Sequence, residues 1–171
     1  TGNGNTAVGQ SALTTNTVGG ANTAFGTRAL FNNTGANNTA VGNDVLFANT
    51  SAGDNTAVGV LSLAASTGAS NSSLGAYSLQ SNTTGFNNTG IGVNALIANT
   101  TGNNNTALGS NANVVTGALT NATAIGANAI VTASNTIQLG NGAVTTVNVG
   151  TGTTAKLVAG ALQVTGGTLT A

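Results

Sequence analysis

A hydrophobic residue followed by glycine recurs along most of the chain at a nearly constant spacing. The first such pair is Val8-Gly9, and the steps between successive glycines are 17, 16, 17, 16, 17, 17, 17 and 14 residues. Nine units of this kind cover residues 1–144, with a consensus close to Asn-Thr-Ala-Val-Gly-x-x-Ala-Leu-x-x-Asn-Thr-Thr-Gly-x-Asn. A period this short and regular predicts a stacked repeat architecture in which each unit contacts only its neighbours.

Each unit is expected to hold two short strands and two turns. Side chains alternate between the faces of a strand, so in Asn-Thr-Ala-Val the Thr and the Val share one face. A second apolar position follows four residues after the glycine, and the Asn, Thr and Gly residues between the two favour turns. We therefore predict an all-β fold, a parallel β-solenoid of about nine coils with 16–17 residues each.

Three other architectures fit the sequence less well. Helical repeats usually need about 33 residues or more, and a unit rich in Gly, Asn and Thr forms helices poorly. Collagen is excluded because glycine is not found at every third position and proline is absent. Disorder is the remaining alternative for a chain with so much Gly, Asn, Ser and Thr. Disorder, however, does not require apolar positions to stay in phase over nine units.

Stacked coils turn each consensus position into a column, with about 4.8 Å between neighbouring coils. Two apolar columns are predicted to form the core, and an Asn column is predicted to form a hydrogen-bonded ladder of the cross-β kind. The first core column contains Val8, Phe25, Val41, Val58, Leu74, Ile91, Leu108, Ile125 and Leu139, and the second contains Leu13, Leu30, Leu46, Leu63, Leu79, Leu96 and Ile130. The polar ladder contains Asn5, Asn22, Asn38, Asn55, Asn71, Asn88 and Asn105.

The near absence of charge excludes several classes of function. The chain has 2 Lys or Arg residues, 2 Asp or Glu residues, and neither His nor Cys. The usual metal ligands, general bases and strong nucleophiles are therefore missing, and we expect neither an enzyme nor a cofactor or metal site. A nucleic-acid groove would need clustered basic residues. No apolar run reaches the 18 residues that a membrane-spanning helix needs, so direct membrane insertion is not expected either.

The thin core predicted for a single coil favours self-assembly. Each coil offers about two large apolar side chains, which contribute about 1.5–3 kcal/mol each when buried. Ordering the backbone costs about 1–2 kcal/mol per residue, so alanine and threonine methyl groups and hydrogen-bond ladders must supply the rest. A second apolar face buried between copies would supply it more easily, which predicts an oligomer.

The repeat resembles the head repeats of trimeric autotransporter adhesins. The family motif is close to Asn-Ser-Val-Ala-Ile-Gly, and residues 121–126 and 135–140 are similar to it, 14 residues apart. The longer units are similar to repeats of phage-type tail fibres and bacterial surface fibres. The resemblance covers residues 1–144 and implies a left-handed β-roll with three parallel chains side by side.

Several candidate sites are weaker than the repeat itself. Residues 150–155 fit the Gly-x-Gly-x-x-Gly/Ala dinucleotide fingerprint, but no acidic residue follows them, so a Gly/Thr turn is the simpler interpretation. Asp44 and Asp54 could ligate calcium, although repeat-type calcium sites place an Asp in every Gly-rich turn. The same two residues are poor candidates for a glycoside-hydrolysing carboxylate pair, because such a pair needs a proton donor with its partner nearby, and nothing in the sequence suggests that arrangement.

Three repetitive features could also be functional. Asn-x-Ser/Thr sequons mark potential glycosylation sites, although the repeat itself accounts for them. A threonine row with β spacing resembles the surface of ice-binding solenoids. The row lies on the same strand face as the first core column, however, which suggests that the threonine side chains point inward. Phe31 and Phe47 occupy equivalent positions and could either be exposed contact points or pack between chains. The sequons begin at Asn32, Asn37, Asn49, Asn71, Asn82, Asn87, Asn99, Asn104 and Asn121, and the row is Thr6, Thr23, Thr39, Thr56, Ser72, Thr89, Thr106 and Thr123.

The function expected from these features is structural and adhesive. We expect a segment of an extracellular or cell-surface homotrimeric fibre, or of a virion fibre, that is stiff and nearly uncharged. Its expected partners are copies of itself and a host or prey cell surface, matrix or glycan. The alternative is an ice-binding or other ligand-binding solenoid. Residues 145–171 lack the repeat and are expected to leave the solenoid as strands that wrap the other chains.

Overall fold

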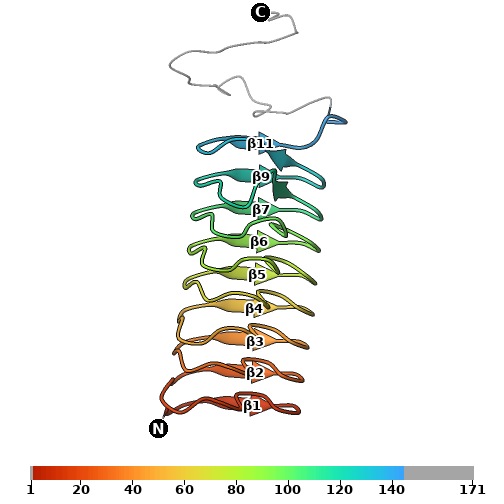
Figure 1. The fold of residues 1–171 in the computed structure, drawn as a ribbon. Helices are drawn as coiled ribbons and strands as arrows, with labels where there is room; N and C mark the ends of the chain where they lie inside the picture. The colour runs from red at the N-terminus through yellow and green to blue at the C-terminus, as the bar shows by residue number, and fades with distance from the viewer. Residues whose placement is uncertain (1, 145–171) are drawn as a thin grey trace, which may run out of the picture.

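The computed structural model describes residues 2–144, which form one elongated stack of β-strands (Figure 1). Nine strands make a single parallel sheet, and each coil contributes one of them. No helix occurs among these residues, and none of them could therefore span a membrane as a helix. The sheet consists of β1 (Thr6–Val8), β2 (Thr23–Phe25), β3 (Thr39–Val41), β4 (Thr56–Val58), β5 (Ser72–Leu74), β6 (Thr89–Ile91), β7 (Thr106–Leu108), β9 (Thr123–Ile125) and β11 (Ile137–Leu139).

Equivalent residues of successive coils lie directly beside one another in the sheet. Thr6 pairs with Thr23, and Val8 pairs with Phe25, in the first parallel ladder. The same register continues to the last ladder, between β9 and β11. Each consensus position therefore forms a straight column, and the nine-stranded stack is roughly 40 Å long at about 4.8 Å per strand. The predicted parallel β-solenoid is confirmed for this part of the chain.

The leucine column fills the interior of the coils. Leu30, Leu46, Leu63, Leu79 and Leu96 have no exposed surface, and Leu13 in the first coil is half-buried. All six adopt a positive φ, between 49° and 52°, which is rare for a bulky residue. This left-handed conformation turns the chain sharply while keeping the leucine side chain directed inward.

The first predicted core column lies on the outside of the coil, contrary to expectation. Val8, Phe25, Leu74, Ile91, Leu108, Ile125 and Leu139 are exposed, and Val41 and Val58 are half-buried. Between the two ends of the stack, the central residue of each three-residue strand points inward instead, and Ala24, Ala40, Ala57 and Ala107 are fully buried. Inward-pointing leucines occupy most of the narrow interior, so only Ala, Ser or Gly fits opposite them.

The last coils fill their interior in a different way. Two additional strands, β8 (Asn113–Val114) and β10 (Ile130–Val131), form a separate parallel pair. Val114 and Val131 are buried there, whereas Ile130 is exposed and does not belong to the core as predicted. Neither Asn113 nor Ile130 takes the positive φ of the leucines, so the backbone continues as a strand and the next residue points inward.

The buried asparagine column links each coil to the next through the backbone. The side-chain oxygen of Asn22 accepts a hydrogen bond from the backbone N–H of Asn38, at 2.9 Å. The side-chain nitrogen of Asn22 donates to the carbonyl of Gly35, also at 2.9 Å. The same pattern repeats along the column and ends at Ala122, whose N–H still donates to Asn105 but which has no amide to continue the ladder.

The glycine column is a point of close contact between successive backbones. These glycines have φ values between 111° and 136° from Gly9 to Gly126. A Cβ atom on Gly92 would lie 2.6 Å from the carbonyl carbon and oxygen of Gly109 in the next coil. Only glycine combines this backbone conformation with such a close approach.

Candidate functional site: the outer face of the strand stack

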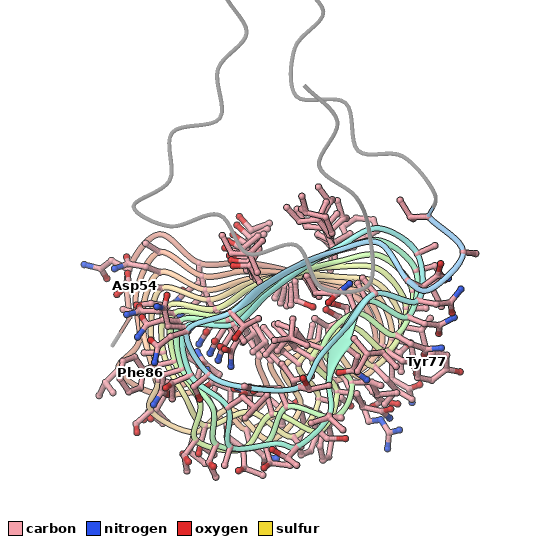
Figure 2. All side chains as sticks on the ribbon, turned by 90° about the horizontal axis from the view of Figure 1, so that it is seen from above. Asp54, Tyr77 and Phe86 are labelled. Carbon is pink, nitrogen blue, oxygen red and sulfur yellow. The ribbon has the colours of Figure 1, made fainter. Side chains whose placement is uncertain are left out.

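The outer surface of the nine-stranded sheet runs along the whole described stack. We call it the strand face and define it by two columns, the threonine row and the apolar column that begins with Val8. Viewed along the stack, side chains stand outward from the strands in two groups (Figure 2). The threonine row is exposed or half-buried throughout and therefore does not point inward as the sequence suggested.

The strand face carries no charge and is largely apolar. Val8, Phe25, Leu74 and Leu108 each expose about half of their surface, between 47% and 56%. Ile91 and Ile125 each expose 39%. These exposed apolar side chains lie beside one another in the sheet, and a contiguous exposed apolar patch on a soluble protein is often functional. The described residues contain no pocket that could hold a small molecule instead.

The charged residues of the described part do not assemble into a catalytic or metal centre. The guanidinium of Arg28 forms a two-point ion pair with the carboxylate of Asp44, with N–O distances of 2.6 and 2.7 Å. Asp54 accepts a hydrogen bond from the side chain of Asn37 at 3.1 Å. Asp44 follows β3 and Asp54 precedes β4, so the two carboxylates flank the strands at opposite ends. Residues 2–144 contain no cluster of acidic, His or Cys side chains suitable for a metal ion.

The two equivalent phenylalanines stack on the surface of neighbouring coils. The ring centroids of Phe31 and Phe47 lie 5.4 Å apart, with 15° between the ring planes. The guanidinium carbon of Arg28 lies 5.4 Å from the centroid of Phe47. Both phenylalanines are half-buried and contact each other within one chain.

Burial divides the potential glycosylation sites into two groups. Asn49, Asn71, Asn82 and Asn99 are fully buried, with side chains engaged in hydrogen bonds inside the coils. Asn37, Asn87, Asn104 and Asn121 form a corner column in the left-handed conformation that favours asparagine. Asn32 is half-buried and donates to the carbonyl of Phe47. The fold thus accounts for these asparagines without glycosylation.

Residues 145–171, including the Gly-rich segment 150–155 and the predicted strands that wrap neighbouring chains, lie outside the described residues. Comparison of the sequence with protein-family models and with curated proteins, and of the structure with solved structures, gives no match. The fold and the strand face define the class of the molecule: it is a parallel β-solenoid repeat protein.

Proposed function

We propose that the chain is a structural segment of an extracellular homotrimeric fibre, in which the strand faces of three parallel chains meet. The observation that carries this proposal is the uncharged apolar column along the outside of the sheet. Burying each of its large side chains stabilises the assembly by about 1.5–3 kcal/mol at most. The three-chain arrangement follows the resemblance to trimeric adhesin heads and fibre repeats.

The proposed role is mechanical. Each coil is connected to the next, along the axis of the stack, by backbone hydrogen bonds and by side-chain amides. A fibre made in this way is stiff and projects whatever is attached to its ends. Repeated identical coils would present any adhesive group, such as one for a cell surface, matrix or glycan, many times, so that binding would be multivalent.

Charge placed on the strand face tests this proposal. The double variant Ile91→Lys/Leu108→Lys should keep its β-type circular dichroism spectrum but lose the oligomeric mass, because two lysines per chain would be buried near those of the neighbours. The matched control is Ser51→Lys/Thr101→Lys, which adds the same charge at exposed positions outside both the strand face and the corner that follows the strands. Unchanged oligomeric mass in the Ile91/Leu108 variant would contradict the proposal.

Ice binding is a second candidate, favoured by the outward threonine row. A flat array of hydroxyl and methyl groups with regular β spacing can order water. The neighbouring column is uneven, however, since Phe25, Val41 and Leu74 differ in size and would interrupt a flat ice-contacting surface. A thermal-hysteresis measurement separates the two candidates. Hysteresis that is lost in Thr89→Lys/Thr106→Lys would favour ice binding over the fibre.

A further inference from the structure

The corner that follows the sheet strands becomes apolar in the middle of the stack. In the outer coils this corner carries polar residues, such as Gln10, Ser110 and Asn111. In the central coils it carries four apolar residues, which we call the exit patch. Val60, Tyr77 and Val93 expose 43%, 39% and 47% of their surfaces, and Leu61 is half-buried.

Two residues of the exit patch occupy a backbone position that suits asparagine better. Leu61 and Tyr77 have φ values of 56° and 59°, the same conformation as Asn94, Asn111 and Asn128 in the equivalent positions. Asparagine visits this region more readily than a bulky residue does. The chain therefore accepts backbone strain to place apolar side chains at a solvent-facing corner.

Another exposed apolar side chain, separate from the exit patch, lies at the opposite end of the strands. Phe86 precedes β6 and exposes 45% of its surface, whereas equivalent positions hold Gly20, Ala36, Gly53 and Asn103. Its backbone N–H donates to the side-chain oxygen of Asn103 at 2.9 Å, which fixes the loop around it. Phe86 and Tyr77 point away from the coil on opposite sides (Figure 2).

These two features fit one another in a parallel assembly. When copies are related by an axis parallel to the stack, the start of a strand in one copy approaches the end of the same strand in the next. Phe86 lies just before β6, and Val93 lies just after it. Tyr77 lies just after β5, one coil or about 4.8 Å away along the stack. An exposed aromatic ring would thus lie level with an exposed apolar patch.

The strand face is too small to form a stable interface by itself, so an additional contact between copies is needed. Three-residue strands are about 10 Å wide, and nine of them give a face of roughly 400 Å², which each chain would divide between two neighbours. A stable interface usually buries about 800 Å² per partner. We propose that Phe86 of one chain packs against the exit patch of the next copy and closes the trimer. This inference rests on the proposed function.

Engineered cysteines test the corner contact directly, because the chain has no cysteine of its own. The full-length double variant Phe86→Cys/Val93→Cys should form covalent trimers on mild oxidation or with a short bismaleimide, and reductant should reverse the oxidised product. Phe86→Cys alone and Val93→Cys alone should stay uncrosslinked. Circular dichroism checks that each variant keeps the β-solenoid.

The outcomes separate the corner contact from the fibre proposal. A trimeric mass without any covalent product from either reagent would overturn the corner contact and leave the fibre intact. A monomeric mass of the unmodified chain would overturn the fibre, and the corner contact with it. Covalent dimers as the final product, or crosslinking of Phe86→Cys alone, would show a different arrangement of copies and overturn the inference.

Discussion

Many single side chains in this protein contact the neighbouring coil as well as their own. In one interior column, Asn49 donates to the side-chain oxygen of Asn33 at 2.7 Å, and Asn99 donates to Asn82 at 2.9 Å. Ser66 interrupts this column, so the side-chain oxygen of Asn49 is buried without a hydrogen-bond partner. A buried unsatisfied polar atom costs about 1–3 kcal/mol.

Replacing Ser66 with asparagine should therefore stabilise the protein. The introduced amide would lie two residues before Gly68, as Asn33 lies before Gly35, and could donate to Asn49 as Asn49 donates to Asn33. We expect Ser66→Asn to raise the free energy of unfolding by about 1 kcal/mol. The control, Ser66→Ala, should lower it because the side-chain nitrogen of Asn82 loses one of its two acceptors and keeps only the carbonyl of Gly85. A melting temperature of Ser66→Asn at or below that of the unmodified chain would contradict this account.

The leucine column should show an unusual order of substitution effects. Leu63→Ala should lose about 2–5 kcal/mol through the cavity it leaves. Glycine usually destabilises by a further 0.5–1 kcal/mol or so, but the φ of 51° at Leu63 removes that penalty. We therefore expect Leu63→Gly to be at least as stable as Leu63→Ala in urea unfolding. Ala57→Gly, at a strand position, should destabilise in the ordinary way, and a Leu63→Gly variant clearly weaker than Leu63→Ala would count against the left-handed turn.

At the scale of the element, the coil depends on a few positions where neighbouring backbones touch. Gly92→Ala should weaken the stack strongly, because its Cβ would lie 2.6 Å from the Gly109 carbonyl and its φ is 131°. Gly142→Ala is the matched control, since nothing lies within 4 Å of a Cβ there. Thermal melting followed by circular dichroism should show a clear loss for the first variant only. Equal melting of the two would mean that successive coils are not in contact at the glycine column.

The sequence predicted the coil architecture well, but it predicted only in part which residues face the interior of the coil and which face outward. The 17-residue period set the parallel register, and the leucine and asparagine columns are buried because their spacing places them in one phase. The strand alternation alone could not decide whether Ala57 or its neighbours Thr56 and Val58 face the core. That choice depends on how much interior the leucines fill, which depends on their left-handed conformation. The exit patch and Phe86 are visible in the sequence only as departures from a polar consensus.

At the scale of the whole molecule, charge contributes little to stability. The chain has four charged side chains, and Arg28 and Asp44 pair on the surface, where such a pair is worth about 0–1 kcal/mol. We expect the melting temperature to change by no more than a few degrees between about 0.05 and 1 M NaCl, because the protein has almost no charge–charge interactions for salt to screen. A steep decrease with salt would show that the assembly depends on ion pairs, and differential scanning calorimetry measures it directly.

The molecular mass of the full chain in solution tests the central claim most directly. Light scattering coupled to gel filtration should give a mass near three times the 16.2 kDa of one chain, or about 49 kDa, and melting that depends on concentration. A monodisperse species of 16.2 kDa, with melting independent of concentration, would contradict the claim that the strand face is an interface between copies.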